Sequence, residues 1–224
     1  MRDGNLFVIE GAGDGVGKTT QFEMTRDHLR EDGHSTITHH FPSYGTPQGK
    51  LVEMYLQGLL GDKESLSPYV INALYALDRK ITFEKKLQQP YENGELILLD
   101  RYTTSSLIYQ SALMEDEEKK KEFIDYVTNL EYKEMALPEP NNVIFLDAPY
   151  ELIAELRARR ASNEGIANDI HEKDQEFMKK VYDSAQFVAD YLGFDRVRCD
   201  DGWQMRKRED IHEEVYEKIK TKIR

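Results

Sequence analysis

The chain has 224 residues, one cysteine and a formal net charge of −12. This length suffices for one domain with a full hydrophobic core, while a single cysteine excludes a disulfide framework and a cysteine-based metal cluster. The acidic balance argues against a nucleic-acid or anionic-membrane surface, which needs a broad basic face. Because the sequence also shows neither a signal core nor a membrane-spanning apolar stretch, we expect a single cytoplasmic domain over residues 1–224.

Apolar runs typical of β-strands alternate with segments of helical length along the chain. The expected strands are residues 6–9, 35–39, 96–99, 143–146 and 196–199. The first, third and fourth runs are continuously apolar, which is typical of central parallel strands covered on both faces. The alternation therefore predicts an α/β fold of three layers, with a doubly wound parallel sheet of five strands between helices.

A glycine-rich segment follows the first expected strand directly and opens a helix. Backbone N–H groups of such a loop curl around an anion, the helix adds its positive end, and a lysine reaches the outer phosphates of a nucleotide. The residues expected to bind these phosphates are Gly13, Gly15, Val16, Gly17, Lys18, Thr19 and Thr20, with the Thr19 hydroxyl as a magnesium ligand. Ala12 stands where the strict motif has glycine, so either alanine is tolerated or one residue is added between Gly11 and Asp14. The alternative is an ordinary glycine-rich turn.

Three later helices are indicated by their caps or by their periodicity. Ser67 and Pro68 predict a helix start, because serine is a favoured cap and proline is favoured in the first turn. Apolar side chains at three- and four-residue steps predict a buried face on each helix. These faces are formed by Val70, Leu74, Leu77 and Ile81, by Met178, Val181, Ala185, Val188 and Leu192, and by Ile211, Val215 and Ile219.

The third expected strand ends in a carboxylate, Asp100, which Arg101 follows at once. At the carboxyl edge of a sheet, beside a phosphate-binding loop, such an aspartate meets magnesium directly or through water. The planar donors of Arg101 are suited to bridge two phosphates. A cap on the next helix is the alternative role for Asp100.

Tyr75 and Arg79 are four residues apart and share one face of an expected helix. An aromatic ring and a guanidinium one turn apart are suited to cover a flat base and donate hydrogen bonds to its carbonyl groups, with Asp78 orienting the arginine. A surface ion pair with a tyrosine packed beside it is the alternative.

An arginine cluster, Arg157, Arg159 and Arg160, ends a helix and precedes a polar, glycine-containing stretch. This pattern predicts a short helical lid, about residues 157–172, whose cations Arg157 and Arg160 close onto a triphosphate. The alternative is that these arginines only complement the helix dipole.

The histidines give no sign of a metal site. His39, His40 and His171 have no companion ligands at metal spacing. We expect them to be solvated or to form structural hydrogen bonds.

Four segments, in chain order, resemble those of thymidylate kinases. Residues 10–21 are similar to that family's P-loop apart from the added residue, 41–45 to its Phe-Pro loop, 72–79 to its base-reading helix, and 100–110 to its Asp-Arg-Tyr…Ser…Tyr-Gln signature. The resemblance covers nearly the whole chain and implies a P-loop kinase fold that transfers the γ-phosphoryl group of ATP to dTMP with Mg²⁺, in a homodimer. Two alternatives stay open: a kinase of the same fold for another deoxynucleoside monophosphate, and a nucleotide-binding protein without catalysis.

The same resemblance implies roles for single residues. Phe41 and Tyr75 flank thymine, Arg79 donates to a base carbonyl, Ser105 and Ser106 belong to the substrate pocket, Tyr109 lies under the deoxyribose, and Tyr44 approaches the acceptor phosphate. Asp14 helps to place the metal or the acceptor. Gly15 stands where some relatives carry a catalytic arginine, so Arg157 and Arg160 are implied as catalytic together with Lys18 and Arg101. Many relatives also carry an arginine in the Phe-Pro loop, and Ser43 and Tyr44 leave none here.

Overall fold

The computed structural model describes residues 4–13, 15–61, 65–164 and 175–224, and of residues 160–164 only the backbone. Asp14 and residues 165–172 of the expected lid therefore lie outside the described residues, as does His171. For Arg160, the structure gives a place in a helix but no side-chain contacts.

The sheet has five parallel strands in the order β2-β3-β1-β4-β5. The strands are β1 (Asn5–Gly11), β2 (Thr36–His40), β3 (Leu96–Asp100), β4 (Asn142–Asp147) and β5 (Asp195–Arg198). Each lies at a run predicted to be a strand, with its ends within two residues of the predicted ones. The central strand β1 is buried along its whole length, as its continuous apolar sequence predicts.

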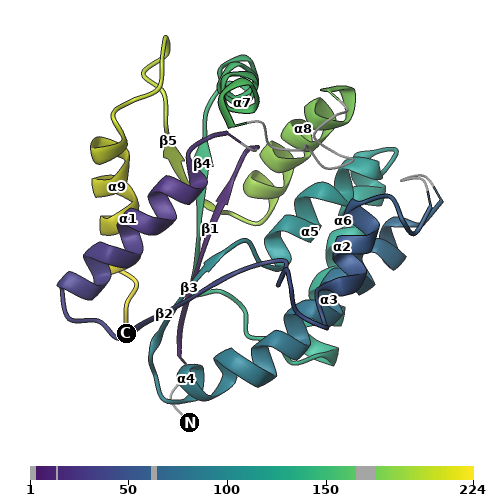
Figure 1. Ribbon diagram of the computed structural model, residues 1–224, viewed down its shortest axis with the longest axis horizontal. Helices are drawn as coiled ribbons and strands as arrows, with labels where there is room; N and C mark the ends of the chain where they lie inside the picture. Colours follow the sequence, from purple (N-terminus) through teal and green to yellow (C-terminus); the bar gives the residue numbers. More distant parts are fainter. Residues whose placement is uncertain (1–3, 14, 62–64, 165–174) are drawn as a thin grey trace.

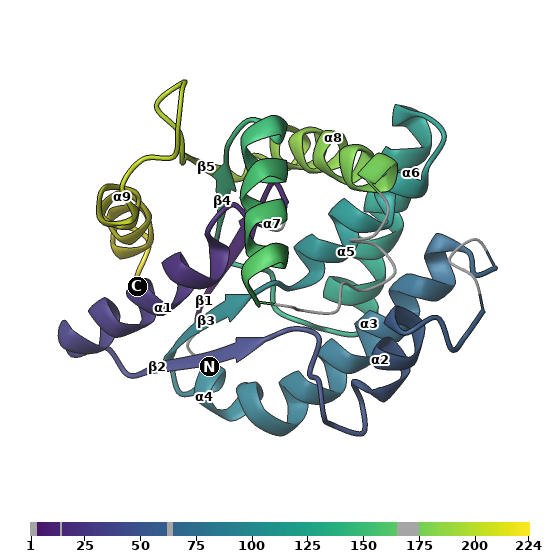
Figure 2. The ribbon, with the colours of Figure 1, turned by 45° about the horizontal axis from the view of Figure 1, so that its top comes forward.

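Helices cover both faces of this sheet, which confirms the doubly wound α/β arrangement (Figure 1). The α-helices are α1 (Lys18–Glu31), α2 (Lys50–Leu56), α3 (Pro68–Thr82), α4 (Gln88–Glu92), α5 (Thr103–Tyr109), α6 (Glu117–Thr128), α7 (Tyr150–Glu164), α8 (Gln175–Tyr191) and α9 (Arg208–Lys220). Two π-helical segments, η1 (Phe83–Leu87) and η3 (Asn129–Glu134), continue α3 and α6, and a 3-10 turn, η2 (Ser111–Leu113), follows α5. Figures 1 and 2 show α1 and α9 together on one face and α3, α5 and α8 on the other.

The core follows the alternation of side chains along the central strands. Leu6 and Val8 of β1 belong to a cluster with Phe83 and Leu87 of η1, whereas Phe7 belongs to the larger cluster that includes buried residues of α1 and α9. Both faces of the sheet are thus sealed, and the loops at its carboxyl edge are left to form a site. Among the described residues, no helix combines the length and apolar character needed to cross a bilayer.

The buried face predicted for α3 is wrong at two of its four positions, since Leu74 and Ile81 are half-buried but Val70 and Leu77 are exposed. Ser67 caps the helix as predicted, accepting a hydrogen bond from the backbone N–H of Val70 at 3.3 Å, but Val70 and Leu77 are 46% and 45% exposed. The residues that the helix buries are Ile71, Asn72, Ala76, Asp78, Arg79 and Thr82, four of them polar. Polar side chains are buried on this face because they hydrogen-bond to other elements, which apolar periodicity cannot register.

The faces predicted for α8 and α9 are confirmed, apart from one residue. Met178, Val181, Ala185 and Val188 are buried, as are Ile211, Val215 and Ile219. Leu192 follows the end of α8 and is 37% exposed.

Candidate active site

The glycine-rich loop joins the end of β1 to the start of α1. Gly17 precedes the helix with φ at 98°, a left-handed conformation that suits glycine. No side chain of the described residues caps α1, and its first turn contains no acidic residue. The first backbone N–H groups of this helix are therefore available to an anion, which the helix dipole also favours.

The loop packs closely against α7 at Gly15. Its φ is +107°, and a Cβ atom built there would lie 3.3 Å from both the backbone nitrogen of Arg157 and the carbonyl oxygen of Ile153. An arginine at this position would therefore meet both backbone strain and a steric contact. The same contact places the backbone of Arg157, whose side chain is half-buried, directly beside the loop.

Asp100 lies at the end of β3, in register with His40 at the end of β2. Its Oδ2 atom accepts a hydrogen bond from Nδ1 of His40 at 2.9 Å, and its Oδ1 atom lies 3.9 Å from Nζ of Lys18. Burial acts to raise the pKa of Asp100, but the hydrogen bond from His40 and the charges of Lys18 and Arg101 outweigh it and lower this pKa. Asp100 is thus held as a carboxylate.

These residues fit a magnesium ion shared with a nucleotide. The Oδ1 atom of Asp100 is buried and has no hydrogen-bond partner among the described residues, and Thr19 is exposed at the start of α1. Within the described ranges, no three histidine, cysteine, aspartate or glutamate side chains form a metal cluster. Magnesium suits such a site, because it is usually bound by one or two protein groups together with substrate phosphates and water.

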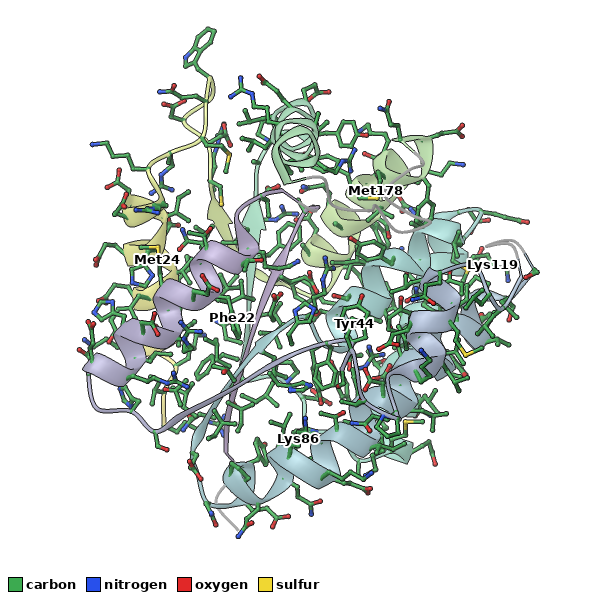
Figure 3. The ribbon with its side chains drawn as sticks, in the orientation of Figure 1. Phe22, Met24, Tyr44, Lys86, Lys119 and Met178 are labelled. Atoms are coloured by element: carbon green, nitrogen blue, oxygen red, sulfur yellow. The ribbon has the colours of Figure 1, made fainter. Side chains whose placement is uncertain are left out.

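A single pocket brings together every residue predicted to bind the acceptor. It has a volume of about 190 Å³ and is lined by His40, Phe41, Pro42, Tyr44, Leu56, Tyr75, Arg79, Arg101, Tyr102, Ser105, Ser106, Tyr109 and Gln110. Tyr44, labelled in Figure 3, lies on the loop after β2. The sequence prediction did not include His40, whose hydrogen bond is with Asp100 of the site itself.

Arg79 is fully buried, and its partner is Glu131. The guanidinium makes two hydrogen bonds to this carboxylate, Nε to Oε2 at 2.7 Å and Nη2 to Oε1 at 2.6 Å. The prediction that Asp78 orients Arg79 is therefore wrong. Asp78 instead accepts a hydrogen bond from the backbone N–H of Ser43 at 2.7 Å, so it fixes the Phe-Pro loop.

Ser43, which stands where many relatives carry an arginine, is buried and bonded within the protein. Its hydroxyl lies 2.9 Å from Oγ1 of Thr82 and 2.9 Å from Nε2 of His39. The loop before it contains a cis peptide bond between Phe41 and Pro42. The loop therefore supplies no cation in place of that arginine.

Arg101 joins β3 to α5 in an unusual backbone conformation. Its φ is 67°, which a residue other than glycine adopts only where its surroundings fix it, often at a functional site. Its guanidinium lies 5.5 Å from the centre of the Tyr109 ring. This arrangement places a cation in the wall of the pocket, one residue after Asp100.

Glu10 connects the phosphate-binding loop to the pocket and was also missed by the sequence analysis. Its buried carboxylate accepts hydrogen bonds from the hydroxyls of Thr104 at 3.0 Å and Ser105 at 2.5 Å, and from the backbone N–H of Gly11 at 3.1 Å. The start of the loop and the start of α5 are thus held by one side chain.

Comparison with known proteins agrees with this geometry. The family model "Thymidylate kinase" matches residues 9–193. The thymidylate kinase of Mycobacterium tuberculosis (strain ATCC 25618 / H37Rv) is 31% identical over 79% of this chain and 81% of its own. That of Halothermothrix orenii is 29% identical over 97% of each chain, and a probable thymidylate kinase of Caldivirga maquilingensis is 29% identical over 79% of this chain and 77% of its own. The chain therefore belongs to the thymidylate kinase family.

Proposed function

We propose that the chain transfers the γ-phosphoryl group of ATP to dTMP, giving dTDP and ADP. The observation that carries this proposal is the contact between the two halves of the site. Lys18 of the phosphate-binding loop lies beside Asp100, and Arg101, the next residue, lines the acceptor pocket. Two nucleotides bound at these places would have their phosphates adjacent, as an in-line transfer requires.

Phosphoryl transfer depends on positioning and positive charge from the protein more than on proton transfer. The attacking group of a nucleoside monophosphate is already an anionic oxygen, so no strong general base is needed. We propose that the amides of Gly13 and residues 15–20, with the ammonium of Lys18, bind the ATP phosphates, that Arg101 bridges donor and acceptor, and that Arg157 and Arg160 of α7 act on the phosphates as well. Mg²⁺ held by Thr19 and Asp100 would supply further neutralisation of charge, and Asp14 takes the role that the resemblance implies, helping to place the metal or the acceptor.

On the acceptor side, the pocket residues take the roles that the family resemblance implies. Phe41 and Tyr75 flank the base, and Arg79 and Ser106 provide its polar contacts. Tyr109 lies under the deoxyribose, Tyr44 approaches the acceptor phosphate, and Ser105 belongs to the same substrate pocket. The support for these roles is that all of these residues line one pocket.

We also propose a homodimer in the cytoplasm. Large apolar side chains are exposed on neighbouring helices, namely Leu51 of α2 and Tyr69, Val70 and Leu77 of α3. A second copy of the chain is the occupant that family resemblance suggests for this surface, and sedimentation of the wild type beside Leu77→Glu tests it.

The single cysteine, Cys199, is buried and free, which fits a reducing compartment such as the cytoplasm.

The proposed reaction is tested by ADP release with a panel of acceptors. We expect turnover with ATP and dTMP, less with dUMP, dCMP or dGMP, and a loss of at least about 10²-fold in turnover for Lys18→Ala. Lys119→Ala is the matched control, because Lys119 pairs with Glu122 in solvent on α6. Preference for another monophosphate would identify a kinase with a different acceptor, and ATP binding without turnover of any acceptor would indicate a protein without catalysis.

A further inference from the structure

The buried pair Arg79–Glu131 joins two elements that are distant in the sequence. Arg79 lies on α3, and Glu131 lies on the π-helical segment η3; their side chains are 1% and 0% exposed. Thr103 at the start of α5 also donates to Oε2 of Glu131, at 2.9 Å. Three elements around the pocket therefore meet at one carboxylate.

The partners of Arg79 account for all but one of its N–H groups. A guanidinium has five donors in a fixed plane. Nε and one hydrogen of Nη2 go to Glu131, and the other hydrogen of Nη2 goes to the hydroxyl of Ser106 at 2.9 Å, with a longer contact of 3.5 Å to Oδ1 of Asn72. Nη1 has one long contact, 3.4 Å to the carbonyl oxygen of Tyr102, so its second hydrogen has no acceptor among the described residues.

Because Arg79 lines the pocket, that remaining donor is available to a base bound there. Thymine and uracil carry a carbonyl oxygen at position 4, which accepts from an N–H group, whereas cytosine carries an amino group that only donates. A donor facing this position favours the first pair and leaves an unpaired buried N–H group with the second. The selectivity depends on the guanidinium being held in one orientation.

We propose that Glu131 is a positioning residue that sets the base selectivity of the acceptor pocket by fixing the guanidinium plane of Arg79. This inference rests on the proposed function. A carboxylate is required because both of its oxygens accept, which matches the two parallel donors Nε and Nη2. Glutamine has the same shape, but its amide nitrogen would face one of these donors, so the guanidinium must rotate to avoid it.

The test compares acceptors in wild type, Glu131→Gln and Glu134→Gln. Glu134 lies on the same π-helical segment and is exposed, so its variant controls for a change in η3. For Glu131→Gln we expect kcat/KM for dTMP to fall by about 10²-fold, since small misplacements of positioning groups have effects of this size. The preference for dTMP over dCMP should fall by about tenfold or more, while KM for ATP stays within about twofold.

Arg79→Met and the double variant Arg79→Met/Glu131→Gln complete the comparison. If Glu131 acts through Arg79, the double variant has the same dTMP to dCMP preference as Arg79→Met. Binding of dTMP by calorimetry, well below each melting temperature, separates this effect from a loss of folded protein. The inference is overturned if Glu131→Gln has an unchanged preference for dTMP over dCMP, or if its KM rises equally for ATP and dTMP. Either result leaves the proposed function standing. A wild type without dTMP-dependent ADP release overturns both.

Discussion

The imidazole of His40 holds one oxygen of the Asp100 carboxylate and leaves the other turned toward Lys18. Nδ1 of His40 lies 2.9 Å from Oδ2, whereas Oδ1 lies 3.9 Å from Nζ of Lys18. Since an ionised carboxylate only accepts hydrogen bonds, Nδ1 of His40 carries the proton. The ring therefore fixes the orientation in which Asp100 presents its free oxygen to a cation.

From this contact we expect His40→Ala to weaken metal binding more than nucleotide binding. Loss of a residue that orients a ligand typically lowers metal affinity by about 10- to 100-fold. Binding of Mn²⁺, measured by electron paramagnetic resonance with ATP present, and the Mg²⁺ concentration for half-maximal turnover both report it. His40→Asn is the matched variant, because its amide N–H can replace Nδ1. Equal metal affinity in wild type and His40→Ala would contradict this prediction.

Asp78 fixes the Phe-Pro loop, so its removal should weaken the binding of the acceptor without changing the choice of base. Asp78→Ala leaves the buried N–H group of Ser43 without its partner, which costs about 1–3 kcal/mol of stability. We expect a higher KM for dTMP, because Phe41 lies on the same loop, with an unchanged dTMP to dCMP preference. Chemical denaturation and acceptor kinetics measure the two effects. A change in preference as large as that of Glu131→Gln would restore Asp78 as the residue that orients Arg79.

Local sequence patterns predicted most of the fold and the loop around the donor phosphates. The five strands were indicated by short apolar runs, and α1 by Gly17 and Lys18, because these signals need no knowledge of distant residues. The residues predicted around the acceptor also share one pocket, although their individual roles came from resemblance and stay predictions.

These local patterns could not predict polar contacts between residues that are distant in the sequence. Glu131 lies 52 residues from Arg79, and nothing in a mixed segment of acids and lysines distinguishes it from its solvated neighbours. The same limit explains the error on α3, where apolar periodicity placed Val70 and Leu77 inside. The buried side of that helix combines Ile71 and Ala76 with polar residues, and among these Asp78 and Arg79 have partners on the Phe-Pro loop and on η3.

The environment of His39 predicts a loss of stability in mild acid. Burial, together with the nearby charge of Lys86 (labelled in Figure 3), lowers the pKa of His39 to about 4. Between pH 6.5 and 4 the unfolded chain therefore binds a proton at this site that the folded chain does not, so stability falls as the pH falls through this window. Below about pH 4 this contribution no longer changes.

We expect His39 alone to account for roughly 2–3 kcal/mol of this decline. Urea denaturation at pH 7, 5.5 and 4.5 measures it when wild type is compared with His39→Gln, whose amide can replace the contact of Nε2 with Ser43. The variant should show the shallower decline. Parallel curves for the two proteins would exclude His39 as the titrating group.

The close approach of Gly15 to α7 leads to a prediction with an internal control. Gly15 and Gly33 both have positive φ, +107° and +86°, but only Gly15 has neighbours that an added Cβ atom would meet. Each change to alanine should cost about 1–2 kcal/mol of stability from the left-handed backbone. Gly15→Ala must also move the loop away from the backbone of Ile153 and Arg157, which lie 3.3 Å from the new atom.

Only Gly15→Ala should therefore change the handling of ATP. Displacement of the loop alters the N–H groups that surround the phosphates, so we expect a higher KM for ATP and about 10²-fold lower turnover, since catalysis by positioning is sensitive to shifts of about 1 Å. Gly33→Ala, at the far end of α1, should keep both values near those of wild type. Thermal denaturation of the two variants shows whether their strain is comparable, and ADP release at several ATP concentrations gives the kinetic difference. If the two variants are equally active, the contact between the loop and α7 has no part in placing the donor nucleotide, and Arg157 loses its structural support as a catalytic residue.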